Sequence, residues 1–313
     1  MTDDDMRPRP VPPPSESRHS GRRPDAHRSV GALWGGTFAV VGRRWRDLAV
    51  AATLGSALWL VAFVSAYVGM DELFDGRFWE KLDALFDGQI ETSAEVEVWM
   101  ASFEFIFTPQ AAVLLLVALI ASFFSILQAA ASAQIARQEL TGINAGGSTA
   151  VSIALSRLPA LLLVNLVLFV IQAVLFLVGM GLAAAADSLG VVWDLITFVV
   201  VAVIGPLLTI LWVMVYVEPG LPSLRRWSRL LGRTKLATWG RVVLFDLVRM
   251  VFAAVAFVVL MLSPLSFAYS LAIVVVLVWP VTVGIVTVSH VIMYGDLVSA
   301  LSSAGGAPED DQG

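Results

Sequence analysis

The chain has 313 residues, of which 58% are hydrophobic and only 14% are charged, and its mean hydropathy is +0.82. Because soluble domains carry about 25% charged residues, this composition excludes an ordinary soluble protein and indicates a membrane protein. The absence of cysteine excludes disulfides and thiolate metal sites. The net charge of −5 is uninformative by itself, because acidic and basic residues are segregated along the chain.

Residues 1–28 are polar and rich in proline and arginine, so they cannot bury enough apolar surface to offset the entropy of ordering. We predict that they form a disordered cytoplasmic tail. No short apolar core lies near the N-terminus, so we do not expect a signal peptide. The first long hydrophobic stretch follows Arg43, Arg44 and Arg46, and we expect it to act as an uncleaved anchor.

Six stretches are long and apolar enough to cross a bilayer, which takes about 20 residues as a helix. They cover residues 48–70, 110–135, 158–186, 191–217, 242–263 and 268–293. Pro206 and Pro280 lie inside the fourth and sixth stretches, where each is expected to kink its helix. The sequence therefore predicts an all-α, polytopic membrane protein with six transmembrane helices over residues 29–297. A disordered acidic tail is expected over residues 298–313.

The positions of lysine and arginine predict the orientation. Nine arginines precede the first span, and six basic residues lie between the fourth and fifth spans. The loop after the first span, residues 71–109, has ten acidic residues against two basic ones. We therefore expect six spans with both termini in the cytoplasm. Arginine outnumbers lysine 18 to 2, which favours a GC-rich bacterial source and hence a bacterial plasma (inner) membrane.

Three segments before pairs of spans, at 30–48, 148–158 and 221–241, show apolar residues at helical spacing with arginine near the turn into lipid. This pattern predicts short amphipathic cytoplasmic elbow helices whose arginines contact anionic lipid head groups. The alternative is that arginine occupies every cytoplasmic loop for topological reasons alone. The candidate lipid contacts are Arg43, Arg44, Arg46, Arg157, Arg225, Arg226, Arg229 and Arg233.

The outer loop at 71–109 has aromatic and leucine side chains at helical spacing within its acidic background. One interpretation is an aromatic belt that packs the loop onto lipid. The other is a docking surface for a protein partner in the cell envelope.

The segment from Tyr216 to Val248 joins the end of one span to the start of the next and contains Glu218, the run Leu224-Arg225-Arg226-Trp227, and Gly240. It resembles the membrane domain associated with glycerophosphoryl diester phosphodiesterases and its stand-alone, YciC-like relatives. The run MYGDLVSAL from Met293 is similar to the exit of the last span in that family. The resemblance implies a membrane domain of six or more spans. Its catalytic barrel needs more than 200 residues, and too few follow Met293, so we expect no phosphodiesterase activity.

Asp246 and Arg249 are the notable charged residues within a span, where charge is costly and often functional. If that span begins at Val242, Arg249 lies about 10 Å inside it and can reach back to the head groups. One interpretation is that the two side chains, three residues apart on the helix, form a structural ion pair. The other is that they line a polar cavity or a site for lipid head groups. Asn165 and Gln172 share a helical face in the third span, where they form either interhelical hydrogen bonds or a translocation path.

The sequence lacks a P-loop, an HExxH motif and a glycine-rich dinucleotide turn, and its one histidine within a span, His290, does not make a metal site. We therefore expect no catalytic residues, no metal site, no cofactor and no nucleic-acid partner. The leading hypothesis is a non-enzymatic integral membrane protein, a lipid-interacting scaffold or accessory factor of the cell envelope. The alternative is a small transporter or lipid-translocating module, built around the kinked spans with Asp246 and Arg249. An intramembrane enzyme is the weakest hypothesis.

Overall fold

The computed structural model describes residues 28–73, 109–143, 145–263 and 265–303. The expected outer loop at 71–109 and the expected N-terminal tail, 1–28, lie almost wholly outside these residues. The expected C-terminal tail, 298–313, lies outside them from residue 304 onward, whereas residues 298–303 are helical. Every regular element in the described part of the chain is helical, which confirms the all-α prediction. The elements are α1 (Val30–Leu73), α4 (Pro109–Leu140), α5 (Gly147–Ser156), α6 (Leu158–Ala185), α7 (Asp187–Val217), α8 (Leu224–Leu231), α9 (Lys235–Met261), α10 (Phe267–Ile273) and α11 (Trp279–Ser303).

Five helical segments among the described residues are long and apolar enough to cross a membrane. They are Val30–Gly69, Leu158–Gly179, Ser188–Val217, Lys235–Met261 and Phe267–Ser302. The chain is therefore built as a multi-pass membrane protein. The expected span at 110–135 falls within α4, which is helical but is not among these five, so a sixth crossing stays a prediction.

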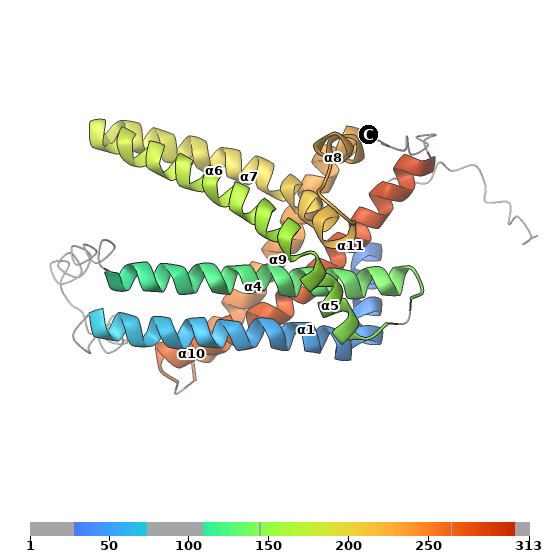
Figure 1. Cartoon of the computed structure of the whole chain (residues 1–313), viewed down its shortest axis with the longest axis horizontal. Coiled ribbons are helices and arrows are strands. Elements are labelled where there is room, and N and C mark those ends of the chain that lie inside the picture. The colour runs from blue at the N-terminus through green and yellow to red at the C-terminus, as the bar shows by residue number, and fades with distance from the viewer. Residues whose placement is uncertain (1–27, 74–108, 144, 264, 304–313) are drawn as a thin grey trace, which may run out of the picture.

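The helices form a bundle from which one hairpin diverges. Helices α1 and α4 lie side by side, and α11 packs against α1, α4, α7 and α9 (Figure 1). Helices α6 and α7 pair with each other and point away from α1 and α4 (Figure 1). The centre of the bundle is therefore α11, and most side chains between Thr282 and Tyr294 are buried.

Helix α1 bends close to the expected boundary between the first elbow helix and the first span. Its 44 residues form two helical parts that meet at a kink at Arg44, where φ is −114° and ψ is 22°. The two other expected amphipathic segments each contain a separate short helix, α5 and α8.

Proline is also accommodated inside long helices. Pro206 lies within α7, and a π-helical segment, Val274–Val278, leads into α11 just before Pro280.

A close approach of α1 and α4 depends on a glycine. The fully buried Gln128 of α4 donates from Nε2 to the carbonyl of Pro280 in α11, at 2.5 Å. A Cβ atom on Gly55 of α1 would lie only 1.8 Å from Gln128 Oε1 and 2.6 Å from its Cδ. Any side chain at position 55 would therefore have to displace the amide of Gln128, which bonds α11.

We predict that Gly55→Ala lowers the free energy of unfolding by about 1–3 kcal/mol, the cost of leaving buried polar groups unpaired. The measurement is unfolding in mixed micelles followed by circular dichroism. Gly35→Ala, in the first part of α1, is the control, because nothing lies within 4 Å of its Cβ position. That control should gain about 0.5–1 kcal/mol of helix stability. Equal effects of the two substitutions would contradict the packing at Gly55.

Candidate functional site: a cavity at the arginine-rich end

The end of α7 is held by side chains from other segments. The last carbonyls of a helix have no partners within it, and unpaired groups are costly in an apolar environment. Gln134 Nε2 and Arg137 Nη1, both from α4, donate to the carbonyls of Tyr216 and Val217. Arg157 Nη1, from the junction of α5 and α6, donates to the carbonyls of Val215, at 3.3 Å, and Glu218. Cations are also favoured at this end of a helix dipole.

Arg157 lies close to a second cation. Burial of its guanidinium and the charge of Arg137 both lower the pKa of Arg157, and the carboxylate of Glu218 opposes them. An arginine stays charged under such shifts. Two positive charges are therefore held together where α7 ends.

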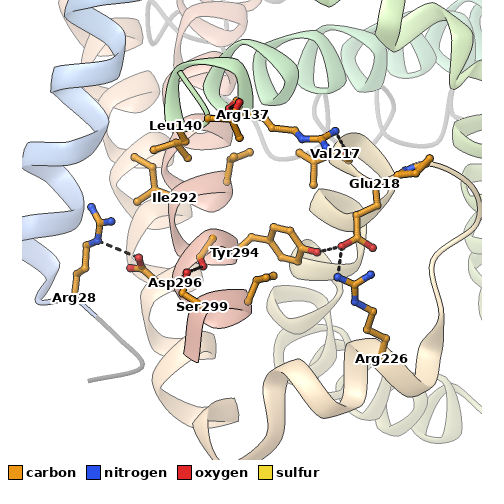
Figure 2. A pocket seen from close by; sticks show the side chains of 15 residues that line it. Arg28, Arg137, Leu140, Val217, Glu218, Arg226, Ile292, Tyr294, Asp296 and Ser299 are labelled. Carbon is orange, nitrogen blue, oxygen red and sulfur yellow. Dashed lines mark hydrogen bonds and ion pairs between the residues drawn. The ribbon is translucent and has the colours of Figure 1, made fainter. Parts of the chain in front are cut away.

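Glu218, the residue that caps α7, connects three helices. Its Oε1 accepts a hydrogen bond from the hydroxyl of Tyr294 in α11. The same oxygen forms an ion pair with Arg226 Nη2 of α8, at 2.8 Å. Figure 2 shows both side chains meeting the carboxylate from different elements. Glu218 therefore fixes α8 and α11 against the end of α7.

A second ion pair lies on the other side of this end of α11. Arg28, just before α1, donates from Nε to Asp296 Oδ1 at 3.0 Å (Figure 2). The other carboxylate oxygen of Asp296 is buried without a partner among the described residues.

These groups border a cavity of about 660 Å³, which we call the outer cavity (Figure 2). Its charged and polar lining includes Arg28, Arg137, Glu218, Arg226, Tyr294 and Asp296. Three arginines and two carboxylates give the charged lining a net positive charge. Each of the three arginines uses only part of its five N–H donors in the contacts described above. The cavity can therefore accept an anion with several oxygen atoms.

Arg44 has a structural environment that differs from the expected lipid contact. It is only 8% exposed, and it donates to Asp47 Oδ2 at 2.6 Å and to the carbonyl of Ala145. Asp47 Oδ1 in turn accepts from the backbone N–H of Gly147 at the start of α5, at 2.6 Å. The guanidinium of Arg44 is thus surrounded by protein and ties α1 to the segment that begins α5.

The other candidate lipid contacts are more accessible. Arg43, which pairs with Glu139 at 2.5 Å, keeps 63% of its side chain exposed. Arg157 is partly buried, and Arg46, Arg225, Arg226 and Arg229 are exposed. The side chain of Arg233 lies outside the described part of the structure.

The four polar residues expected inside the membrane do not gather at one place. Asp246 Oδ1 and Arg249 Nη2 are 3.4 Å apart and border a different cavity. Asn165 and Gln172 lie on α6 and line neither cavity. Helix α9 begins at Lys235, before the expected Val242, so Arg249 lies about 21 Å along it at about 1.5 Å per residue. Arg249 is thus near the middle of its helix.

Sequence reasoning did not assign Arg28, Arg137 or Asp296 to a site. A usable signal exists for Arg137 and Asp296, because each is a charged residue that follows a long apolar stretch. Arg28 falls in a segment whose composition predicts disorder, so composition gave no reason to select it.

Comparison of the chain with protein-family models, with curated proteins and with solved structures found no match. The resemblance to the membrane domain of glycerophosphoryl diester phosphodiesterases therefore stays a prediction.

A double-mutant cycle tests the role of Glu218. We predict that Glu218→Ala and Tyr294→Phe each lower the free energy of unfolding by about 1–3 kcal/mol. Together they should show a coupling energy of about 0.5–3 kcal/mol, because the first removes the acceptor and the second the donor of the same hydrogen bond. The measurement is unfolding in mixed micelles. Glu139→Ala combined with Tyr294→Phe is the control pair, since no contact joins those residues, and it should be additive. Additivity in the Glu218 cycle would refute the described contact.

Proposed function

We propose that this protein is a non-enzymatic integral membrane protein that binds the anionic head groups of lipids at its arginine-rich end. In this role it acts as a lipid-interacting scaffold or accessory factor of the bacterial cell envelope. The observation that carries the proposal is the convergence of Arg28, Arg137 and Arg226 on the outer cavity. Guanidinium groups suit phosphate because they donate several hydrogen bonds in one plane.

The apolar part of the outer cavity supports a lipid over a free anion. Leu140, Val217, Val291, Ile292 and Val298 share its lining with the charged groups. A head-group phosphate beside the arginines would therefore leave its glycerol and first methylenes against apolar side chains. A small soluble anion would not use those walls.

Helix α8 fits a position in the membrane interface. Its Leu230 and Leu231 are buried, whereas Arg225, Arg226 and Arg229 are exposed. A helix with this division of residues tends to lie parallel to the surface with its basic side toward anionic head groups. We propose the same position for α5 and for the first part of α1.

The proposed topology has six spans, including α4, with both termini and the arginine-rich end in the cytoplasm. The basic residues of the sequence support it. The divergent hairpin supports lipid contact as well, because large apolar side chains of α6 and α7 are exposed. They include Leu166, Phe169, Leu177, Val191, Leu195 and Phe198.

A small transporter or lipid-translocating module is the second candidate. The observation that favours it is the separate cavity bordered by Asp246 and Arg249. The absence of Asn165 and Gln172 from its lining counts against a long polar path through the described helices.

An envelope protein partner would contact the outer loop at 71–109, which lies almost wholly outside the described residues.

Lipid retention tests the proposed function. In non-ionic detergent, the double variant Arg28→Gln/Arg226→Gln should bind phosphatidylglycerol about ten- to a hundredfold more weakly. This estimate follows from two lost charge-assisted hydrogen bonds. Native mass spectrometry of the purified protein measures the bound lipid, with phosphatidylcholine as the neutral comparison.

Arg225→Gln/Arg229→Gln is the matched control, because it removes the same charge from exposed positions on α8 outside the cavity lining. It should change retention less than about threefold. Equal losses in the two double variants would point to diffuse surface charge and contradict the cavity as the binding site. Unchanged retention in both would refute head-group binding at this end.

Single cysteines test the topology, because the natural chain has none. We predict that Thr141→Cys and Ser228→Cys react with a membrane-impermeant maleimide only in inverted vesicles. Ser188→Cys, at the start of α7, should react in intact cells. All three positions are exposed, so protein burial does not mask them. Labelling of position 141 or 228 from outside intact cells would reverse the proposed orientation.

A further inference from the structure

A second cavity, which we call the inner cavity, is lined by residues that lie farther from the C-terminal ends of α7 and α11. Its volume is about 520 Å³, and its lining comes from α1, α4, α7, α9 and α11. Consecutive residues on two helices divide the cavities. Tyr216 of α7 and His290 of α11 line the inner cavity, whereas the next residues, Val217 and Val291, line the outer one. The two cavities therefore lie next to each other along the bundle.

Three residues that line the inner cavity each have a buried nitrogen atom without a hydrogen-bond partner among the described residues. These atoms are Trp59 Nε1, Arg249 Nε and His290 Nε2. His290 is only 6% exposed. Buried polar atoms in native proteins are nearly always paired, and each unpaired one costs free energy. Three such atoms from three helices around one cavity indicate a ligand that accepts hydrogen bonds.

The guanidinium of Arg249 is held in a fixed position. Its Cζ lies 4.7 Å from the centre of the Trp279 ring, and its Nη2 faces Asp246 at 3.4 Å. This ion pair is long, and it leaves Nε free. The guanidinium therefore keeps donors for a further acceptor, and its positive charge favours an anion.

The remaining walls of the inner cavity are mostly apolar. Ile126 and Ala129 of α4, Val213 of α7, and Val283 and Val286 of α11 contribute to them. Apolar walls with a few convergent polar groups are typical of sites for small amphiphilic molecules. The size also falls within the usual range of about 300–1,000 Å³ for ligand pockets.

We infer that the inner cavity binds the acidic group of an amphiphile, a phosphate or carboxylate that carries a hydrocarbon chain. Arg249 supplies the positive charge, and Trp59 and His290 donate hydrogen bonds to the same phosphate or carboxylate. The hydrocarbon lies against the apolar walls. This site is separate from the outer cavity and does not depend on lipid binding there.

Fluorescence quenching tests the inference on the purified full chain in non-ionic detergent. The probe is undecanoate with a terminal bromine, which quenches nearby indoles, and Trp59, Trp212 and Trp279 line the cavity. We expect saturable quenching that dodecyl phosphate reverses. Dodecyltrimethylammonium and inorganic phosphate should not reverse it. Reversal by inorganic phosphate at the same concentration would assign the site to a free anion and overturn the amphiphile.

Substitutions identify the groups that bind. Arg249→Gln should weaken the probe at least tenfold, and Trp59→Phe, which removes only the N–H donor, should weaken it about threefold or more. Asp246→Asn should leave binding equal or tighter, because it removes the competing carboxylate. If Asp246→Asn abolished binding and dodecyltrimethylammonium competed with the probe, the site would bind cations and the inference would fail.

Arg241→Gln is the control on the same helix, because Arg241 lines neither cavity, and it should leave probe binding unchanged. The Arg28→Gln/Arg226→Gln variant should also bind the probe normally. This result separates the two proposals, because that variant loses head-group binding only at the outer cavity. Equal quenching in all variants would show partitioning into the micelle and overturn the inner site.

Discussion

The carbonyl groups that end α7 need hydrogen-bond donors, and the chain supplies them from other segments. A long apolar helix cannot leave these groups unpaired where water is scarce. Gln134, Arg137 and Arg157 meet this need, and Glu218 then attracts Arg226 and Tyr294. The contacts that terminate one helix thereby collect positive charge at one end of the bundle. Helix termination and the affinity proposed for anions share a single physical cause.

Helix α11 links the two cavities because it packs against α1, α4, α7 and α9. One stretch of it lines the inner cavity, and the following stretch lines the outer one. Both cavities combine cationic donors with apolar walls, so both suit molecules that have an acidic group and a hydrocarbon part. The two proposed sites would therefore suit lipids better than soluble substrates.

Local sequence patterns predicted the helical class, the long apolar segments and the short helices α5 and α8. The separation of Asp246 and Arg249 by three residues also indicated that they could form an ion pair. These features depend on periodicity and composition, which a single sequence displays. The apolar pattern located α9 well but placed its start late, because the polar first turns of a helix carry little hydrophobic signal.

Long-range contacts were not predictable in the same way. Arg44 is buried because Ala145 and Asp47 are brought around it, and a distant carbonyl leaves no trace in the local pattern. Asn165 and Gln172 share a face of α6, but that helix diverges with α7, so the face does not reach Arg249. The partners of Glu218 likewise come from two other helices. Each of these outcomes depends on which helices become neighbours.

The π-helical segment Val274–Val278 determines which way the rest of α11 faces. A π turn holds about one residue more than an α turn, and one residue corresponds to a rotation of about 100° in an α-helix. If the same residues formed ordinary α-helix, every later side chain would be turned by about that angle relative to α10. His290 would leave the inner cavity and Tyr294 would leave Glu218. The π turn thus determines in which direction the α11 side chains of both cavities point.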